Sequence, residues 1–399
     1  MFNHSSAENN ILSTCFLSSF TFQDGYIVMQ NIAFRADVVG SFLRPAALKQ
    51  ARADFHAGKI SEDELRSVED EAIIDLVAKQ KAVGLKAVTD GEFRRSMWHS
   101  DFFWGFDGIE RKSSDYRVQF NEVSTKFDTS RIVGKIRFSH HPFIEHFKFL
   151  KSVAGDDVIA RQTIPSPSQC YWEFFRPDNL QETLQQYPDL AELQRDIIQA
   201  YRDVVRAFYA AGCRHLQFDD CTWGFLVDQK KFNEMKGLNI TFEEVASLYL
   251  DINNQVLDDK PADMVITTHI CRGNYSSDWW TSGGYEPVAP YVLNKERVNA
   301  FYLEYDTERA GGFQPLDKVT DGKMVVLGLV TSKSPKLEDK SQLKARILEA
   351  SKHVPLEHLC LSPQCGFASN EEGNVLTEEE QWAKIKLIVD VAQDVWGDA

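Results

Sequence analysis

The chain has 399 residues, of which 43% are hydrophobic and 26% are charged, and its formal net charge is -15 at pH 7. This length suffices for one large or two ordinary domains with a sizeable core. The acidic balance and the scattered lysines and arginines argue against a nucleic-acid-binding protein, because phosphate contacts require clustered basic side chains.

Cysteine usage and hydropathy indicate the compartment. The seven cysteines stand at irregular spacing, which fits free thiols in a reducing compartment better than a disulfide framework. No apolar run approaches the roughly 20 residues that a membrane-spanning helix needs. We therefore expect a soluble, cytoplasmic protein with neither a nucleic acid nor a membrane as partner.

Residues 1–30 differ from the rest of the chain, since they contain no lysine or arginine and several serines and asparagines. A secretory signal would need a basic amino-terminal region and a longer apolar core. We therefore expect a poorly ordered N-terminal extension over residues 1–30, with the natural start at Met29. The organised domain is expected over residues 31–399.

From Arg35 onward, short apolar strands alternate with helical stretches. Strands are expected at residues 37–42, 85–89, 157–163, 214–218, 264–270, 302–304, 324–330 and 358–361. Helices are expected at residues 61–83, 190–211, 242–257, 339–352 and 377–395, and a hairpin-like insertion near 113–141. Eight strands in such an alternation predict a single-domain α/β protein, a TIM (β/α)8 barrel. A doubly wound open sheet is the alternative, although no Gly-x-Gly-x-x-Gly motif follows a strand.

Chemically useful side chains follow almost every expected strand. They are Ser41, Glu92, Ser166, Asp219, His269, Cys271, Glu304, Thr331, Lys333 and Cys365. In barrels of this kind, the loops after the strands build the active site at the carboxyl-terminal mouth. We therefore expect these side chains to face one mouth, although serines at strand ends are also common turn formers.

One strand end carries a His-x-Cys pair. The β-branched run at residues 264–268 predicts a buried strand, and residues i and i+2 of a strand point the same way, so His269 and Cys271 should lie side by side. Glu304 and Cys365 accompany two later apolar runs. One histidine, two cysteines and one glutamate form a complete zinc ligand set. From spacing alone, a hydrogen-bonded core histidine with two small buried cysteines remains the alternative.

Three motifs around these residues resemble the zinc motifs in the C-terminal catalytic barrel of cobalamin-independent methionine synthase. They are Thr268-His-Ile-Cys271, Glu304 and Ser362-Pro-Gln-Cys-Gly366. Two further motifs look like those of short, single-barrel bacterial relatives of that enzyme: Asp219-Asp-Cys-Thr-Trp223 and Gly91-Glu-Phe-Arg-Arg95.

The resemblance implies a Zn2+ cofactor held by His269, Cys271, Glu304 and Cys365. It also implies transfer of a methyl group, from 5-methyltetrahydrofolate or a related donor, to the zinc-bound thiolate of L-homocysteine, giving methionine. Glu304 is the hardest of the four ligands, so we expect the substrate sulfur to displace it.

The resemblance further implies contacts for both substrates. Val39-Gly-Ser-Phe42 is similar to a family motif whose backbone and serine hold the homocysteine carboxylate, which implicates Gly40 and Ser41. Glu92 and Asp219 match acids near the amino acid, and the second of these binds its ammonium group. Trp172 matches a tryptophan that stacks on the pterin of the methyl donor.

Two departures from the family pattern concern the methyl donor. The full-length family has a second, N-terminal barrel that helps to bind the folate tail, and this chain lacks it. A family histidine that assists protonation of the leaving pterin is replaced in Thr331-Ser-Lys333-Ser-Pro335, where Lys333 is the candidate acid. A donor other than methyltetrahydrofolate, supplied by a partner protein, is the alternative.

Two other functions stay open from the sequence. One is a different zinc-thiolate alkyltransferase, similar to the coenzyme M transferases, whose sulfonated thiol would call for arginines such as Arg94, Arg95 and Arg272. The other is a non-catalytic zinc-binding barrel, although a structural zinc site would be closed by four permanent ligands. Uroporphyrinogen decarboxylase is a related barrel without zinc, and the His-Cys-Glu-Cys set argues against it.

Overall fold

The computed structural model describes residues 21–23, 26–28, 32–234, 240–320 and 322–398. The chain divides into two compact units, Met1–Asn31 and Ile32–Ala399. In the first unit, β1 (Thr21–Gln23) pairs antiparallel with β2 (Tyr26–Val28). The rest of the extension expected over residues 1–30 lies outside the described residues.

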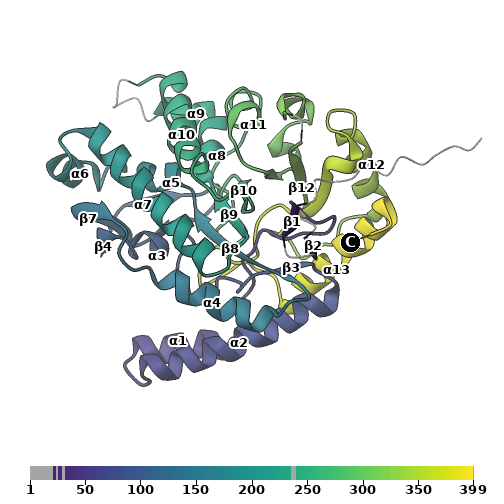
Figure 1. The fold of residues 1–399 in the computed structure, drawn as a ribbon, viewed down its shortest axis with the longest axis horizontal. Helices are drawn as coiled ribbons and strands as arrows, with labels where there is room; N and C mark the ends of the chain where they lie inside the picture. Colours follow the sequence, from purple (N-terminus) through teal and green to yellow (C-terminus); the bar gives the residue numbers. More distant parts are fainter. Residues whose placement is uncertain (1–20, 24–25, 29–31, 235–239, 321, 399) are drawn as a thin grey trace, which may run out of the picture. The chain divides into compact units, whose positions relative to one another are not determined.

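A curled sheet of seven parallel strands forms the centre of the second unit (Figure 1). Its strands are β3 (Ala87–Val88), β8 (Ile159–Pro165), β9 (His215–Asp219), β10 (Val265–Ile270), β11 (Ala300–Glu304), β12 (Met324–Val330) and β13 (Leu359–Pro363). The sheet order follows the chain, so each strand pairs in parallel with the next one. Parallel neighbours need long crossover connections, and helices supply them on the outside of the sheet.

The extended segment 35–42 takes the eighth position, between β13 and β3. On one side, Asp37 N donates to Leu361 O at 3.0 Å and Leu361 N donates to Arg35 O at 2.9 Å. On the other side, Phe42 N donates to Gly91 O at 3.1 Å, just after β3. The barrel predicted from eight strands is therefore confirmed, with an extended segment in place of its first strand.

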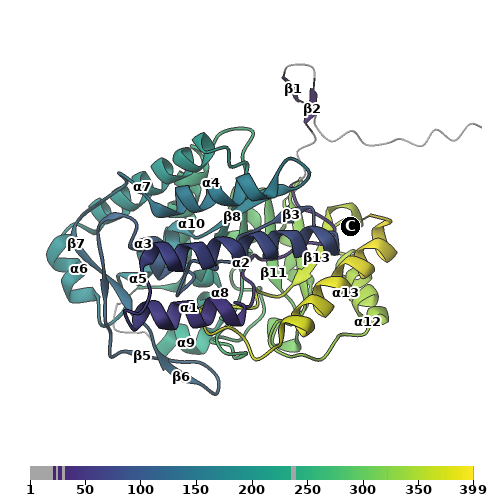
Figure 2. The same cartoon turned by 90° about the horizontal axis from the view of Figure 1, so that it is seen from below.

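Helices cover the outer face of the sheet. The longer ones are α1 (Ala46–His56), α2 (Glu62–Val83), α4 (Pro142–Ala154), α7 (Leu190–Ala210), α10 (Phe242–Leu257), α12 (Lys340–Ala350) and α13 (Glu378–Trp396). Figure 2 shows α2 on the outside of the barrel, where it contacts both α4 and α13. The described part of the chain has no helix with the length and apolar character needed to cross a membrane.

Shorter helices lie in the loops between the strands and the longer helices. The α-helices are α3 (Ser100–Phe103), α5 (Pro167–Glu173), α6 (Leu180–Gln186), α8 (Cys221–Val227), α9 (Gln229–Glu234) and α11 (Val292–Lys295). The 3-10 helices are η2 (Glu308–Ala310), η3 (Gln314–Lys318) and η4 (Leu356–His358). Both α5 and α8 begin directly after a strand end, so their first residues belong to the mouth of the barrel.

Local sequence signals explain where the predicted helices begin and end. The Ser61 side chain accepts from Glu64 N at 3.3 Å while the Glu64 carboxylate accepts from Ser61 N at 2.7 Å, which is a capping box at the start of α2. The helix ends at Gly84, whose φ of 106° is the left-handed conformation that glycine adopts without strain. Capping boxes at Thr241 and Thr377 start α10 and α13 in the same way.

An antiparallel arm occupies the connection between β3 and β8, where the sequence predicts a hairpin-like insertion near 113–141. In it, β4 (Asp107–Lys112) pairs with β7 (Thr129–Arg137), and β5 (Arg117–Gln119) pairs with β6 (Ser124–Lys126). The turn between β5 and β6 contacts the loop after β10: Asn121 N donates to Trp279 O at 2.8 Å, and Glu122 N to Asp278 Oδ2 at 2.6 Å. The arm thereby becomes one wall of the barrel mouth.

A buried ion pair fills the barrel interior, upstream of the carboxyl ends of the strands. Arg161 donates to both carboxylate oxygens of Asp37, at 2.7 and 2.9 Å, and Tyr302 Oη donates to the same carboxylate at 2.7 Å. The backbone N–H groups of Phe34 and Val38 also donate to Asp37. This interior cluster, Asp37, Arg161 and Tyr302, is at most 2% exposed at each residue.

Candidate metal centre

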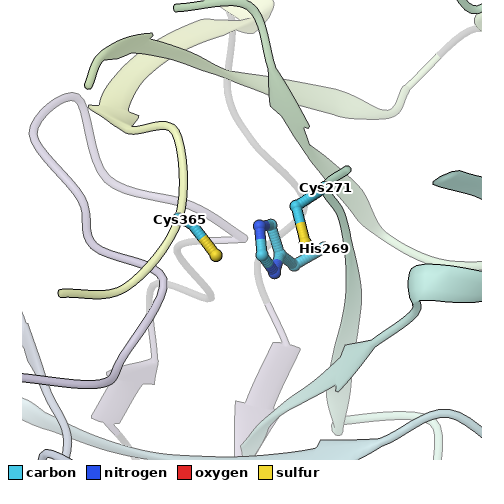
Figure 3. Close-up of side chains that lie close together, drawn as sticks. All are labelled: His269, Cys271 and Cys365. Atoms are coloured by element: carbon cyan, nitrogen blue, oxygen red, sulfur yellow. The ribbon is translucent and has the colours of Figure 1, made fainter. Parts of the chain in front are cut away.

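Three ligand-type side chains meet at the carboxyl-terminal mouth of the barrel (Figure 3). One nitrogen of His269 and the sulfurs of Cys271 and Cys365 all lie within 4.8 Å of one another, and the three residues are buried. His269 belongs to β10 and Cys271 follows its end, whereas Cys365 comes from the turn after β13. The adjacency of His269 and Cys271 is the one that strand alternation predicts.

A further thiol, which sequence reasoning missed, lies beside this group. Cys221 is the first residue of α8, and its Sγ lies 3.5 Å from Sγ of Cys271. It is partly exposed and does not belong to the set within 4.8 Å. The available signal was a cysteine directly after two acids, Asp219 at the end of β9 and Asp220 at the start of α8.

The three thiols differ in pKa. Hydrogen bonds from Cys221 and Cys365 lower the pKa of Cys271 well below its usual value, and the same hydrogen bonds, together with burial, raise the pKa of the two donors. One negative sulfur is thus held by two S–H groups. A divalent cation replaces such protons, because the thiolate is the form that binds metal. Sulfur and imidazole donors in a buried site fit zinc.

The imidazole of His269 is oriented by its neighbours. Its Nδ1 lies 3.0 Å from Asp219 Oδ1, and its Nε2 lies 3.3 Å from the carbonyl oxygen of Gln364. Burial alone would lower the pKa of His269, but the hydrogen bond to Asp219 and the negative charge of Cys271 raise it to about 9. A carboxylate on Nδ1 is the usual support of a metal-binding histidine, and it leaves Nε2 for the ion.

Glu304, the fourth predicted ligand, has a different environment. Its side chain is fully buried at the end of β11, and it does not belong to the set within 4.8 Å. Its Oε2 accepts from the backbone N–H of Arg272 at 2.8 Å, and its Oε1 accepts from Arg309 Nη2 at 2.5 Å. The structure therefore brings together three of the four predicted ligands, and Glu304 lies nearby in an ion pair.

A cavity of about 710 Å³ opens over the three ligands. Its lining includes Ser41, Glu92, Asp219, Cys221, His269, Cys271 and Cys365 together with the aromatic side chains of Trp98, Tyr116, Phe120, Trp172, Phe225, Tyr275 and Trp280. Tyr116 and Phe120 come from the antiparallel arm, which explains why this insertion matters for the site. Apolar walls with a few convergent polar groups are typical of small-molecule sites.

Two carboxylates, Glu92 and Asp219, line this cavity, and Glu92 has an oxygen without a hydrogen-bond partner in the described part of the chain. Glu92 has a left-handed backbone, with φ of 61°, and its Oε1 contacts Thr163 Oγ1 at 2.8 Å and Arg95 at 3.2 Å. Its Oε2 is buried and has no hydrogen-bond partner among the described residues. Burial, with a contribution from the charge of Asp219, raises the pKa of Glu92 to about 7. A strained acid with one oxygen left without a partner, beside a second acid, is an arrangement suited to a cation.

Gly40 and Ser41 lie where segment 35–42 packs against the turn that carries Cys365. A side chain at Gly40 is excluded, because its Cβ would lie 2.8 Å from Thr163 Cγ2 and the glycine has a φ of 140°. Ser41 Oγ faces the backbone after Cys365 so closely that a Cβ at Gly366 would lie 1.9 Å from it. Ser41 thus lines the cavity next to the thiols, and Gly40 allows the close approach that puts it there.

The two residues predicted for the methyl donor lie at different depths. Trp172 lines the cavity and stacks on Phe225, with ring centres 5.0 Å apart, and Phe225 stacks on Trp280 at 5.5 Å. Lys333 is not among the described residues that line the cavity. Its Nζ donates to Asn274 Oδ1 at 3.2 Å, so it reaches the cavity through Asn274, which does line it.

Comparison with known proteins adds to these observations. Residues 34–394 match the family model described as cobalamin-independent synthase, catalytic domain. The chain is 44% identical over 364 residues to the uncharacterized protein YxjG of Bacillus subtilis. This match covers 91% of this chain and 95% of that protein. The solved structure of a candidate vitamin-B12-independent methionine synthase from Listeria monocytogenes has a TM-score of 0.73 at 40% identity and covers 92% of this chain and 99% of that one.

A more distant solved structure shares the fold. The B12-independent methionine synthase from Shewanella sp. W3-18-1, in complex with selenomethionine, has a TM-score of 0.68 at 19% identity. The match covers 91% of this chain and 98% of that one.

Proposed function

The chain belongs to the cobalamin-independent synthase family, and from that premise we propose that it is a zinc-dependent methyltransferase that methylates the thiol of L-homocysteine to give methionine. One observation carries the proposal. In a single cavity, the His269, Cys271 and Cys365 group stands beside the acid pair of Glu92 and Asp219. A soft-metal site next to a cation site suits an amino acid that carries a thiol.

In this proposal, His269, Cys271 and Cys365 hold the metal. When bound, zinc lowers the pKa of a thiol that reaches it and makes the sulfur a nucleophile at neutral pH. Asp219 keeps the imidazole in one orientation through its contact with Nδ1. Three protein ligands leave a fourth position for the substrate sulfur, whereas a structural site would be closed. Glu304 as the resting fourth ligand stays a prediction.

The amino-acid part of the substrate would lie between the acids and the first segment of the barrel. The Glu92 Oε2 atom has no partner among the described residues, and the nearby charge of Asp219 adds to its attraction for an ammonium group. We place the substrate carboxylate against Ser41 and the backbone at Gly40, on the side of the cavity next to Cys365. This orientation directs the short thiol-bearing side chain toward the sulfurs.

The methyl donor would occupy the aromatic side of the cavity. Trp172, Phe225 and Trp280 form a row of stacked rings, against which a planar heterocycle such as the pterin of 5-methyltetrahydrofolate packs well. In the transfer, the N–CH3 bond breaks, the S–CH3 bond forms and the donor nitrogen takes a proton. Lys333, whose Nζ contacts Asn274 at the cavity lining and would turn from it toward the donor, is our candidate for the source of that proton, and a related donor or a donor-supplying protein partner remains compatible with the cavity.

The contacts of three arginines argue against a sulfonated acceptor such as coenzyme M. Arg94 pairs with Glu69 and Asp70, and Arg95 with Glu92 and Thr163. The guanidinium of Arg272 donates to Gly283 O, Tyr285 Oη and the carbonyl oxygens of Glu304 and Ala310. None of the three arginines is among the described residues that line the cavity. The cavity does have lining cations, Arg117, Arg176 and Lys231, but they belong to the arm, to the loop after α5 and to α9, whereas the acids Glu92 and Asp219 stand beside the ligand group.

Calorimetric titration of the zinc-loaded protein separates these acceptors. We expect L-homocysteine to bind, and Glu92→Gln to weaken its binding about 10-fold, because the variant loses a charge-assisted contact to the ammonium group. Coenzyme M should not bind measurably. Mass spectrometry of the product formed with 5-methyltetrahydrofolate then tests the donor. Binding of coenzyme M in preference to L-homocysteine, or a protein that takes up no zinc, would contradict the proposal.

A further inference from the structure

We propose that three cations of the cavity lining form a subsite for the anionic tail of the methyl donor. They are Arg117 of the arm, Arg176 of the loop after α5 and Lys231 of α9. This inference rests on the proposed function, because it concerns the donor that the function requires. It gives the antiparallel arm, which the sequence predicts only as a hairpin-like insertion, a role in binding.

The three cations converge on one short strand of the arm, β5. Arg117 is the first residue of this strand, and Arg176 lies over the ring of Tyr116, directly before it, with 5.3 Å between the guanidinium carbon and the ring centre. Lys231 Nζ donates to the carbonyl oxygen of Gln119, the last residue of the strand, at 3.4 Å. Elements that are far apart in the sequence thus place positive charges along a single wall of the cavity.

The charges of two of these cations are compensated to different extents. Arg117 has no ion-pair partner among the described residues, and its Nη1 donates to Ser124 O at 3.3 Å across the β5–β6 pair. Arg176 contacts Glu173 at 3.4 Å and Asp178 at 3.5 Å, so these acids fix its position and offset its charge. An anionic ligand would therefore gain most from Arg117, in a chain whose net charge of -15 disfavours anions elsewhere.

The cations adjoin the aromatic row that we assign to the heterocycle of the donor. Lys231 Nζ lies 5.2 Å from the centre of the Trp280 ring, and Trp280 ends the row that runs from Trp172 through Phe225. A planar ring packed on this row has its substituent next to β5. The acids assigned to the ammonium group of the amino acid belong to the ends of other strands, β3 and β9, so each substrate meets groups of opposite charge to its own.

The spacing of the cations favours a tail with several separate charges. Strand residues rise by about 3.3 Å each, so the contacts at Tyr116 and Gln119 lie roughly 10 Å apart along β5. A single phosphate or carboxylate would reach only one end of this strand, whereas a chain of linked glutamates carries a carboxylate on each unit. The subsite therefore fits the glutamate tail of a folate better than a single anionic group.

Affinities of the full-length, zinc-loaded protein for three donors measure the contribution of the tail. The donors are 5-methyltetrahydropteroate, which has no glutamate, and 5-methyltetrahydrofolate with one and with three glutamates. In calorimetric titrations we expect the triglutamate to bind about 10-fold more tightly than the monoglutamate, because each added carboxylate forms an exposed ion pair worth a few-fold in affinity. Added salt should reduce this ratio, since exposed charges are screened.

Two matched variants of the arm locate the effect. Arg117→Gln should lower the triglutamate affinity about 3- to 5-fold and leave the affinity for 5-methyltetrahydropteroate unchanged. Arg131→Gln makes the same substitution on β7, where the arginine pairs with Glu110 and neither residue is among the described residues that line the cavity, so it should change neither affinity. Both arginines are exposed, so both variants should fold, which circular dichroism checks.

The outcomes that contradict the inference differ from those that contradict the proposed function. Equal affinities for the monoglutamate and the triglutamate, or an equal loss for 5-methyltetrahydropteroate in Arg117→Gln, would overturn the subsite, while formation of methionine would leave the proposed function intact. Tail-dependent binding without formation of methionine would leave the subsite standing and overturn the methyl transfer. A protein that binds none of the three donors would overturn both the subsite and the choice of donor.

Discussion

Two buried polar clusters in the same barrel differ in how completely their groups are paired. In the interior cluster, both oxygens of Asp37 accept from Arg161, and Tyr302 and two backbone N–H groups complete the set. At the mouth, Glu92 Oε2 has no partner among the described residues, and the sulfurs compete for protons around Cys271. Both clusters are desolvated, so burial does not distinguish them.

The difference indicates which cluster is structural and which is functional. A buried polar group without a partner lowers stability, so it persists where a ligand supplies the missing interaction. The carboxylate of the interior cluster is fully paired, although Arg161 Nε has no hydrogen-bond partner among the described residues, so disrupting this cluster should affect folding. In our proposal a metal and a substrate complete the mouth cluster, so disrupting it should affect binding and catalysis. Substitutions in the interior cluster should therefore lower stability and leave binding unchanged, whereas substitutions at the mouth should lower binding and leave stability nearly unchanged.

The largest effect is expected from Cys365→Ser at the mouth. Loss of one of three closely spaced ligands should lower zinc affinity by more than about 100-fold and methyl transfer by a similar factor. Zinc content by plasma mass spectrometry and product formation are the measurements. Thermal unfolding of the metal-free protein should change little, because the oxygen-for-sulfur change keeps the side chain's size.

A cysteine in the preceding strand provides the control for that experiment. Cys360 is fully buried in β13, and burial raises the pKa of its thiol to about 12, as befits a thiol that only packs. Cys360→Ala should lower stability by about 1 kcal/mol and leave the zinc content at about one per chain. Zinc loss in Cys360→Ala equal to that in Cys365→Ser would contradict the distinction between the two cysteines.

The next largest effect is expected from Asp37→Asn in the interior cluster. The variant leaves the charge of Arg161 buried and uncompensated, which should lower the free energy of unfolding by about 3–5 kcal/mol. Denaturant unfolding measures the change, and zinc content should remain that of the native protein. Tyr302→Phe is the milder companion, since it removes one hydrogen bond worth about 1 kcal/mol. Zinc loss in a folded Asp37→Asn protein would mean that the clusters are coupled.

The pH dependence of stability tests Glu92, the acid whose Oε2 has no hydrogen-bond partner among the described residues. The folded-state pKa of Glu92 is raised to about 7, from 4.5 for an ordinary glutamate, mainly by burial. Between these values the folded protein keeps a proton that the unfolded chain has lost, so the stabilisation is fully present below pH 4.5 and is lost as pH rises through 7. We expect a loss of about 3 kcal/mol over this range, which Glu92→Gln should abolish.

The substrate should weaken this pH dependence. An ammonium group beside Glu92 favours the ionised acid and therefore lowers its pKa. Unfolding free energies of the metal-free protein at pH 5 and pH 8, with and without L-homocysteine, measure the effect. A decline with pH that is the same in the native protein and in Glu92→Gln would show that another group is responsible.

The same contrast explains how much the sequence alone could predict. Strand alternation and capping residues are local, so the pairing of His269 with Cys271 and the limits of α2 follow from short stretches of chain. The barrel follows from repetition of the β-α unit. The first segment was also expected as a strand, over residues 37–42, although only its two neighbours in the folded barrel determine how it closes the sheet.

Contacts between different loops could not be predicted in this way. Glu304 has the residue type and the strand-end position of a ligand, but the turn after β11 brings Arg309 of η2 back onto it, and the backbone N–H of Arg272, from the loop after β10, also donates to it. Cys221 approaches Cys271 only because β9 and β10 are neighbours in the sheet. Lys333 likewise contacts Asn274 from another loop. These positions depend on side-chain packing at the mouth, which the spacing of residues within one strand does not specify.

The smallest effect is expected from Trp172→Leu on the aromatic side of the cavity. The leucine keeps apolar packing against Phe225 but removes the flat face, so affinity for a planar methyl donor should fall by about 3- to 10-fold, the equivalent of about 0.5–1.5 kcal/mol. Affinity for L-homocysteine should not change, because the acids proposed to bind its ammonium group, Glu92 and Asp219, stand at or after the ends of β3 and β9, whereas Trp172 follows β8. The KM for 5-methyltetrahydrofolate and the calorimetric affinity for L-homocysteine separate the two effects. If the amino-acid affinity falls as well, the two substrates share a wall, and the mouth must be treated as one site.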